Sequence, residues 1–447
     1  MNYKKTACAT LLFAATINSG DLFANGIALN ENSTSGLGTA SAGRTSSAKD
    51  ASTLHGHPAG MYKLNGTEIV AGMTVLRVKG DINDVRTTAG PGTNKGDMVP
   101  TQFVPNGYIV TPLNDRWHAG FGFYVPYGMV SDYENGFQGA GHGLYSSLKV
   151  VTLQPTVSYK INDRLAVGLG ITFNRMTSTL SEDLETYNLP NALGGPFGTT
   201  RMRTHGDDDA WGYNVGVLWD ITDRTRFGAT YHSKTDFNLD GNTNIYGFPN
   251  LGLAAGPANA QIPLGDIANR EYKSKVKLDM PDMFDLSFTH KLNDRWTIMA
   301  GATWIHWSRW NSVIIRNQDM NPILGYYLSN VSEQFYFKNT WSEAVGVTYQ
   351  LNPKWELRAG FAFDSTPYKN KYRGVRLPTG NRKDFTVGAG YSPNKDLSFD
   401  TALGIFKEDN SVNKPSRTDL GAELQPEYHA HMKGTAYGLS LGMTQRF

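Results

Sequence analysis

The sequence predicts an all-β protein, a 14-stranded antiparallel transmembrane β-barrel with an N-terminal plug, or hatch. Three observations support this fold class. A short polar turn of one type recurs six times, the segments beside it alternate apolar and polar residues, and charged side chains fall on the non-apolar parity. An even number of strands, with short turns at one end and long loops at the other, is typical of outer-membrane barrels.

The recurring turn has an aliphatic residue, then polar turn-forming residues with a basic one, and often a Trp. Asn, Asp and Pro adopt or preset turn dihedrals, so each turn is expected to join two antiparallel strands. Six hairpins supply twelve strands, and one strand before the first loop and one after the last complete the fourteen. The turns are at residues 113–117, 161–165, 221–225, 292–296 and 351–355, with a variant at 393–397.

The beginning of the chain resembles a secretory signal peptide, which we assign to residues 1–24. Lys4 and Lys5 precede an apolar stretch that ends at Ile17, and the small residue Ala24 precedes the expected cleavage point. The only cysteine, Cys8, lies in this segment, so the mature chain is expected to have no disulfide. No run of about 18 apolar residues follows, so no membrane helix is expected.

Residues 25–63 are predicted to form the plug in the barrel lumen, and residues 64–447 to form the barrel. The first segment is rich in Gly, Ser, Thr and Ala, lacks strand alternation, and offers Leu37, Leu54 and Met61 as packing points. Fourteen strands enclose more space than the roughly eight-stranded barrel that side chains can fill, so a plug is needed. The alternative is a flexible periplasmic leader.

The strands of the barrel show clear two-residue periodicity. Residues 211–221 place Trp, Tyr and Val on one parity and Gly, Asn and Asp on the other, and residues 165–173 and 355–363 do the same. Residues 296–310 carry large side chains on both parities and have no assigned face. The expected lumen is wet, because Glu356, Arg358, Asp364, Asp384 and Asp400 are all on the polar parity. The expected aromatic belt comprises Trp117, Trp296 and Trp355.

Several segments resemble the FadL-type family of long-chain fatty-acid and aromatic hydrocarbon transporters of the bacterial outer membrane. The resemblance is carried by residues 25–31, 35–38, 50–53 and 57–61 in the plug, by Val104-Pro105-Asn106, Met280-Pro281-Asp282-Met283 and Phe361-Ala362-Phe363-Asp364 in the barrel, and by the terminal Phe447. It implies a plugged barrel in which extracellular loops capture an apolar ligand, which then leaves sideways into the membrane through a gap at the third strand. Long-chain fatty-acid uptake is the expected function. The alternatives are an importer of aromatic hydrocarbons, a nonspecific porin and a surface adhesin.

The third strand has the residues that a lateral opening needs. Pro126 donates no ladder hydrogen bond, and Gly120 and Gly122 leave space; alternatively, the glycines fit the taper of the barrel. The plug motif His57-Pro58-Ala59 differs from the motif of the family that it resembles, which has Asn where this chain has His57. That His is expected either to make the plug sensitive to pH or to act as a neutral hydrogen-bonding substitute.

Ligand-binding residues are predicted at two places. A cation would bind a carboxylate headgroup at the inner site, for which Lys338 and Arg175 are the candidates; Arg175 shares the lipid-facing parity of Phe173. Apolar residues of the loops around 180–208 and 238–272 would line an outer groove, or would pack the loops on each other. They are Leu189, Leu193, Phe197, Ile245, Tyr246, Phe248, Leu251 and Leu253.

Other classes of function lack the residues that they need. The one Gly-x-Ser-x-Gly sequence, Gly438–Gly442, lies in the alternating final strand and not at a strand-to-helix turn, and the pairs His55/His57 and His429/His431 are too few for a metal site, so we expect no enzyme, no metal and no cofactor. The net charge of +2 gives no sign of nucleic-acid binding. The expected partners are a hydrophobic small molecule, outer-membrane lipid including lipopolysaccharide, and the barrel-assembly machinery. We expect a monomeric, multi-pass protein of the bacterial outer membrane.

Overall fold

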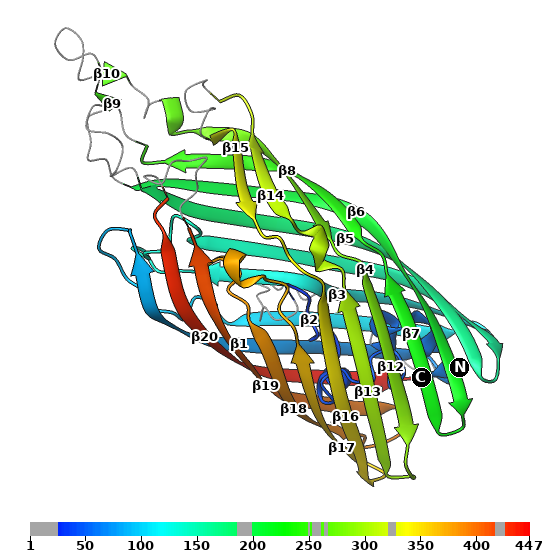
Figure 1. The fold of residues 1–447 in the computed structure, drawn as a ribbon. Coiled ribbons are helices and arrows are strands. Elements are labelled where there is room, and N and C mark those ends of the chain that lie inside the picture. Colours follow the sequence, from blue (N-terminus) through cyan, green and yellow to red (C-terminus); the bar gives the residue numbers. More distant parts are fainter. Residues whose placement is uncertain are drawn as a thin grey trace, which may run out of the picture.

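The computed structural model describes residues 26–185, 199–248, 251–252, 261–262, 267–320, 328–415 and 425–447. These residues form one closed antiparallel barrel, with short turns at one end and long loops at the other (Figure 1). The strands are β1 (Glu68–Thr87), β2 (Gln102–Pro112), β3 (Trp117–Asp132), β4 (Tyr145–Asn162), β5 (Leu165–Glu185), β6 (Thr199–Thr222), β7 (Thr225–His232), β8 (Thr235–Tyr246), β9 (Leu251–Gly252), β10 (Gln261–Ile262), β11 (Glu271–Met280), β12 (Met283–Lys291), β13 (Trp296–Ile305), β14 (Ser312–Asn317), β15 (Asn330–Gln334), β16 (Thr340–Asn352), β17 (Trp355–Asp364), β18 (Asn381–Tyr391), β19 (Leu397–Lys414) and β20 (Tyr428–Arg446).

The wall consists of 18 strand segments, and four pairs of consecutive segments continue one strand across a short interruption. These pairs are β7 with β8, β11 with β12, β13 with β14 and β15 with β16. The barrel therefore has 14 transmembrane strands, which confirms the predicted count. The first and last strands, β1 and β20, pair along almost their whole length and close the cylinder.

The six short turns lie where the sequence predicts them, and they share one hydrogen-bonding device. The side-chain oxygen of the first polar residue accepts from backbone N–H groups two and three residues later, as at Asn114, which accepts from Arg116 and Trp117 at 3.0 Å. This local bond fixes the turn and hence the register of the two strands. The same oxygen acceptor is provided by Asn162, Thr222, Asn293, Asn352 and Asn394.

The apolar parity faces outwards, as predicted. Trp211, Tyr213, Val215, Val217 and Trp219 are all exposed along β6. The predicted aromatic belt is also outside, and each of its Trp rings packs on a Tyr of the neighbouring strand: Trp117 on Tyr159, Trp296 on Tyr349 and Trp355 on Tyr391. These rings mark the membrane–water boundary beside the short turns.

The segment that precedes β1 lies inside the barrel, as the predicted plug requires (Figure 1). It contains the short helices α1 (Thr34–Leu37), α2 (Thr53–Gly56) and η1 (Pro58–Lys63). Thr34 Oγ1 lies 2.8 Å from Ser440 Oγ on β20, while Thr45 Oγ1 donates to the Gly228 carbonyl on β7 at 2.8 Å. The plug is therefore bound to separate parts of the wall. No helix in the described ranges is long and apolar enough to cross a bilayer.

The inward-facing charges are paired with one another and with the plug. The charged residues of β17 and β18 do face inwards, but they are buried in ion pairs. Arg358 bonds Asp400 at 2.6 Å and Glu356 at 2.8 Å, and Lys49 of the plug reaches Glu356 at 2.6 Å. The plug thus supplies one partner of these charges, and a polar space of about 560 Å³ lies beside them.

Residues 296–310, which had no predicted face, change their environment where β13 ends. Trp296 and Ile298 face outwards near the short turn. Beyond Ile305 the chain forms the 3-10 turn η4 (Trp307–Arg309), and Trp307 and Trp310 turn into the barrel, where they are buried. Large residues occupy both parities because the interior of this half is apolar rather than polar.

Candidate functional site

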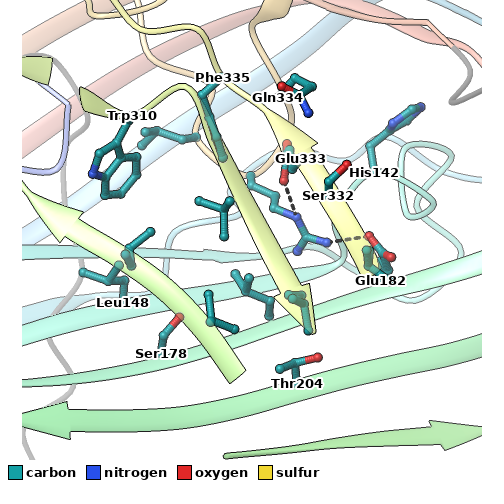
Figure 2. Close-up of a pocket in the computed structure, with 18 of the residues that line it drawn as sticks. His142, Leu148, Ser178, Glu182, Thr204, Trp310, Ser332, Glu333, Gln334 and Phe335 are labelled. Carbon is teal, nitrogen blue, oxygen red and sulfur yellow. Dashed lines mark hydrogen bonds and ion pairs between the residues drawn. The ribbon is translucent and has the colours of Figure 1, made fainter. Parts of the chain in front are cut away.

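A cavity of about 490 Å³ lies in the half of the barrel nearest the long loops (Figure 2). This volume is within the range of about 300–1,000 Å³ that is typical of small-molecule sites. Strands β3 to β6, β8, β11, β14 and β15 supply its wall. The apolar lining residues are Met129, Leu148, Leu180, Leu239, Val276, Leu278, Trp310, Val313, Ile315, Val331, Phe335 and Leu377.

One side of the cavity is charged. Arg376 comes from the loop between β17 and β18, which folds into the barrel, and its guanidinium bonds Glu182 at 2.7 Å and Glu333 at 3.0 Å (Figure 2). Lys414 also contacts Glu333, at 3.1 Å. Lys371 of the 3-10 turn η5 (Asn370–Tyr372) lines the same space, is exposed, and has no ion pair within the described residues.

The charged side therefore carries three cations against two carboxylates. His142 adds no charge at neutral pH, because burial lowers its pKa to about 4. Arg376 is already saturated, since it also donates to Ser146 and to the Ser181 carbonyl. The positive charge in excess is consequently at the lysines, and the cavity combines a long apolar wall with a cationic end.

An aromatic cluster closes the inner end of the cavity. Trp310 stacks on Phe337 with the ring centroids 5.7 Å apart, and Trp307 meets Trp310 edge-on at 5.2 Å. Phe335 and Tyr368 pack against the same rings. Offset and edge-on arrangements of this kind are favourable, so the cluster forms a rigid apolar floor.

The wall is interrupted beside this floor. The ladder between β2 and β3 runs from Pro112–His118 to Gly107–Phe123 and stops there; no further β2–β3 pair is present, although both strands are fully described. The pairing of β3 with β4 also shifts register between Tyr124 and Tyr127. Pro126 lies in this break, and Met129, three residues further along, lines the cavity.

The beginning of the plug takes the place of β2 at this break. The Leu29 N–H donates to the Pro126 carbonyl at 2.9 Å, and the Gly128 N–H donates to the Ile27 carbonyl at 3.0 Å. Ala28 and Tyr127 form the bridge between these two bonds. A short stretch of the plug thus satisfies the backbone of β3 from inside the barrel, and the outer strand does not.

The predicted glycines of β3 lie outside the break. Gly120 and Gly122 are paired in register with both β2 and β4. A Cβ atom on Gly120 would lie 2.5 Å from Leu54 of the plug, and one on Gly122 would lie 2.9 Å from Leu54. Both glycines therefore accommodate a side chain of the plug, which neither the expected opening nor the alternative, a fit to the taper of the barrel, included.

The motif His57-Pro58-Ala59 lies against the opposite wall. His57 is fully buried and its Nε2 is 3.0 Å from the Val217 carbonyl on β6. A Cβ atom on Gly168 would come within 2.3 Å of the Ala59 nitrogen, and one on Gly216 within 2.9 Å of the His57 ring. Burial lowers the pKa of His57 to about 4, so the imidazole is neutral near neutral pH.

The two predicted inner-site cations lie outside the cavity. Lys338 belongs to the interruption between β15 and β16, where the alternation changes phase, so Phe337 points inwards and Lys338 is exposed. The expectation that Lys338 faces the lumen is therefore wrong. Arg175 is exposed on the outer surface of β5, as its parity implies, and bonds Asp207 at 2.6 Å and Asp209 at 3.0 Å.

The structure describes the side chains of three of the predicted outer-groove residues, Ile245, Tyr246 and Phe248. Ile245 is buried in an apolar cluster with Ile315 and Val331, both of which also line the cavity, and Phe248 packs against this cluster. Tyr246 points outwards. Leu251 lies in β9, but its side chain is not described, and Leu189, Leu193, Phe197 and Leu253 lie outside the described residues.

Arg376, Lys371 and Lys414 were missed by sequence reasoning. Arg376 and Lys371 lie in a loop, where no alternation predicts which side chains face the lumen. Lys414 is the last residue of β19, where the strand passes into a long loop. The inward turn of Trp307 and Trp310 was a usable signal, because large apolar side chains on the polar parity indicate an apolar patch inside the barrel.

Comparison with known proteins agrees with this architecture. The sequence profile described as "Outer membrane protein transport protein (OMPP1/FadL/TodX)" matches residues 15–447. The "Long-chain fatty acid transport protein" of Escherichia coli O6:H1 is 25% identical over 412 residues, which cover 89% of this chain and 90% of that protein. Relatives with these names are transporters, and the enzyme class is thereby set aside.

Solved structures give the same result for the fold. The crystal structure of a Pseudomonas aeruginosa FadL homologue is 25% identical and superposes with a TM-score of 0.80 over 94% of this chain and 99% of that chain. The toluene transporter TodX of P. putida is 18% identical, with a TM-score of 0.63 over 89% of this chain and 94% of that chain, and shares the fold. The chain is a protein of the bacterial outer membrane and belongs to the OMPP1/FadL/TodX family of outer membrane transport proteins.

Proposed function

We propose that this protein imports long-chain fatty acids across the outer membrane. The acid is captured among the long loops, is held in the cavity with its carboxylate at the lysines, and is released sideways into the membrane beside β3. The cavity carries the proposal: a long apolar wall with an excess of one positive charge at one end matches a molecule with a hydrocarbon chain and one carboxylate.

Burial of the hydrocarbon chain supplies most of the affinity. Each methylene removed from water contributes about 0.8 kcal/mol, so ten buried methylenes contribute about 8 kcal/mol before the cost of ordering the ligand. The headgroup adds orientation. Lys371, which has no ion pair within the described ranges, and Lys414, which shares Glu333 with Arg376, are the donors for the carboxylate.

Capture at the loops is supported by continuity of apolar surface. The cluster around Ile245 and Phe248 shares Ile315 and Val331 with the cavity wall. An apolar chain that enters at these loops would move to the cavity along side chains that exclude water. Among the predicted groove residues, Ile245 and Phe248 are those with this connection.

Lateral release is supported by the break in the wall at Pro126. The backbone of Ile27–Leu29 bridges β3 there from within, the Val125 N–H also donates to Asn32 Oδ1 at 3.2 Å, and Met129 of the same strand lines the cavity. Movement of this short stretch would join the cavity to the membrane without passing through the rest of the plug. An apolar molecule gains from this route because its chain stays out of water.

Paired ligands test the carboxylate site. We expect the purified protein to bind palmitate more tightly than hexadecanol, which has the same chain and no charge. The double substitution Lys371→Gln/Lys414→Gln should remove this preference and weaken palmitate binding by about tenfold or more, because charged hydrogen bonds contribute about 1.5–3 kcal/mol. Binding is measured by titration calorimetry in detergent.

The matched control is Lys369→Gln, because Lys369 is exposed in the same loop and does not line the cavity. It should leave both affinities unchanged. If the double variant retains the wild-type preference for palmitate, the assignment of the headgroup site is wrong. If neither ligand binds the wild type, the fatty-acid proposal itself fails.

The aromatic floor favours a second candidate, an aromatic hydrocarbon as the ligand. Trp310, Phe335 and Phe337 could stack with a benzene ring at the inner end of the cavity. This ligand needs no cation, so toluene binding should be indifferent to the lysine substitutions. Binding of toluene in the cavity that exceeds that of palmitate would select this candidate.

A further inference from the structure

The outer surface carries a group of cations just above the apolar band on four adjacent strands, β18, β19, β20 and β1. These strands lie side by side in Figure 1. On each strand the outward apolar residues end and a cation follows towards the long loops: Phe385 is followed by Lys383, Ile405 by Lys407, Tyr437 by Thr435 and Lys433, and Val75 by Arg77 and Lys79. We call Arg77, Lys79, Lys383, Lys407 and Lys433 the basic row; all five are exposed.

The strand register places these residues next to one another. Lys383 is directly opposite Lys407, Lys407 is opposite Thr435, and Thr435 is opposite Lys79. Side chains directly opposite on one face have their Cβ atoms about 4.5–5.5 Å apart, and like charges in this position destabilise a sheet. The sequence therefore maintains a repulsive arrangement at this place.

Within the described residues this charge is compensated only in part. None of the five cations makes an ion pair there. The nearest outward acids, Asp81 and Asp409, lie directly opposite Lys433, at the end of the basic row that is nearest the loops. Asp409 is moreover bound by His431 at 2.6 Å. The basic row thus keeps an excess of positive charge.

The opposite wall shows that this is no general property of the surface. Several outward cations there are paired with acids: Arg175 bonds Asp207 and Asp209, Lys275 bonds Asp240 at 3.1 Å, and Lys234 bonds Asp236 at 2.5 Å. The exposed Arg203, Lys273 and Arg316 have no ion pair among the described residues. The opposite wall neutralises several of its cations through ion pairs within the chain, whereas no member of the basic row is paired in this way among the described residues.

We propose that the basic row binds the phosphate groups of lipopolysaccharide in the outer leaflet. The loop end of the barrel faces outside the cell, so the row lies at the outer edge of the hydrocarbon layer, with lipid-facing Phe385, Ile405 and Tyr437 immediately below it. A ligand for this place has acyl chains beside the apolar band and anionic groups directly above them. Lipid A has both features, and its phosphates offset the repulsion between Lys383 and Lys407.

The test compares three forms of the protein, delipidated in detergent, for retention of added lipid A by native mass spectrometry. The wild type should retain bisphosphorylated lipid A and lose it when both phosphates are removed from the lipid. The variant Lys79→Gln/Lys383→Gln/Lys407→Gln should bind the bisphosphorylated form about 100-fold more weakly, since each surface cation near an anionic lipid contributes several-fold. Heat-modifiable migration on gels confirms that each variant is folded.

The matched control is Lys234→Gln/Lys275→Gln/Lys277→Gln, which removes the same number of charges from the opposite wall. It should bind lipid A as the wild type does. Equal losses in the two variants, or equal retention by the wild type of lipid A with and without phosphate, would overturn the proposal. So would displacement of lipid A by millimolar inorganic phosphate, because the row would then be a site for free anions.

Discussion

At the scale of single residues, the fit between the plug and the wall depends on glycines. Gly168 and Gly216 leave room for the motif His57-Pro58-Ala59, and a Cβ atom at either position would overlap the plug. The sequence places these glycines on the inward parity, but it contains no sign of the segment that they accommodate. Such contacts between distant parts of a chain have no periodicity and are visible only in the folded protein.

The buried His57 predicts how attachment of the plug depends on pH. Burial lowers the pKa of His57 from 6.5 to about 4. The neutral imidazole therefore makes its full contribution to the stability of the folded protein above about pH 6.5, and this contribution is lost as the pH falls towards 4. At pH 5 the loss is about 2 kcal/mol, because each pKa unit corresponds to about 1.4 kcal/mol. Near neutral pH the imidazole is neutral and its Nε2 lies 3.0 Å from the Val217 carbonyl, which is consistent with the expectation of a neutral hydrogen-bonding group.

The measurement is thermal unfolding in detergent at pH 7 and pH 5, for the wild type and for His57→Asn. We expect the wild type to lose more stability than the variant on acidification, since Asn does not titrate. His55, whose pKa burial also lowers, remains in both proteins, so its contribution cancels in the comparison. Parallel shifts of the two proteins would show that His57 makes no such contribution.

At the scale of elements, β3 is where sequence reasoning was partly right. The sequence predicted a defect in this strand from Pro126, Gly120 and Gly122, and the break in pairing does include Pro126. The effect of Pro126 could be predicted from the sequence, because a proline has no backbone N–H to donate to a neighbouring strand. Whether a glycine leaves space or receives a side chain depends on the plug, and Leu54 fills the space at both glycines.

The parity rule fails for a similar reason at Lys338. Short interruptions such as that between β15 and β16 change the phase of alternation, and no residue type in 335–339 marks where the change occurs. The strand count is unaffected, because it was derived from the six Asn- or Thr-stabilised turns. Local turn chemistry was therefore predictable, while the sidedness of residues beyond an interruption was not.

The contact between Gly120 and Leu54 makes a prediction for β3. Gly120→Leu should destabilise the protein by about 1–3 kcal/mol through overpacking. Adding Leu54→Ala should recover most of this loss, because the new side chain fills the space that Leu54 vacates. The four proteins of the double-mutant cycle are compared by thermal unfolding in detergent. Additive losses would show that the two positions do not share one space.

At the scale of the whole molecule, the barrel combines an apolar exterior, a plug attached to several strands, and an apolar cavity between the plug and the long loops. The ion pair of Lys49 with Glu356 joins the body of the plug to one side, and His57 joins it to another. The stretch Ile27–Leu29 is different, because it covers the break in β3 with two backbone hydrogen bonds. We therefore expect this stretch, and not the body of the plug, to move during transport.

A reversible cross-link tests this expectation most directly. Ala28 and Tyr127 form a bridge flanked by the two hydrogen bonds, an arrangement with Cα atoms about 4.5 Å apart that a disulfide can span. Cysteines introduced there pair only with each other, since Cys8 is the one native cysteine and lies in the predicted signal peptide. The control pair is Thr34→Cys/Ser440→Cys, which joins the body of the plug to β20.

The measurement is uptake of labelled oleate by cells that carry Ala28→Cys/Tyr127→Cys, before and after reduction. The account predicts that the oxidised protein does not transport, that reduction restores uptake, and that the Thr34/Ser440 cross-link leaves uptake unchanged. Unimpaired uptake through the oxidised Ala28/Tyr127 pair would contradict lateral release beside β3.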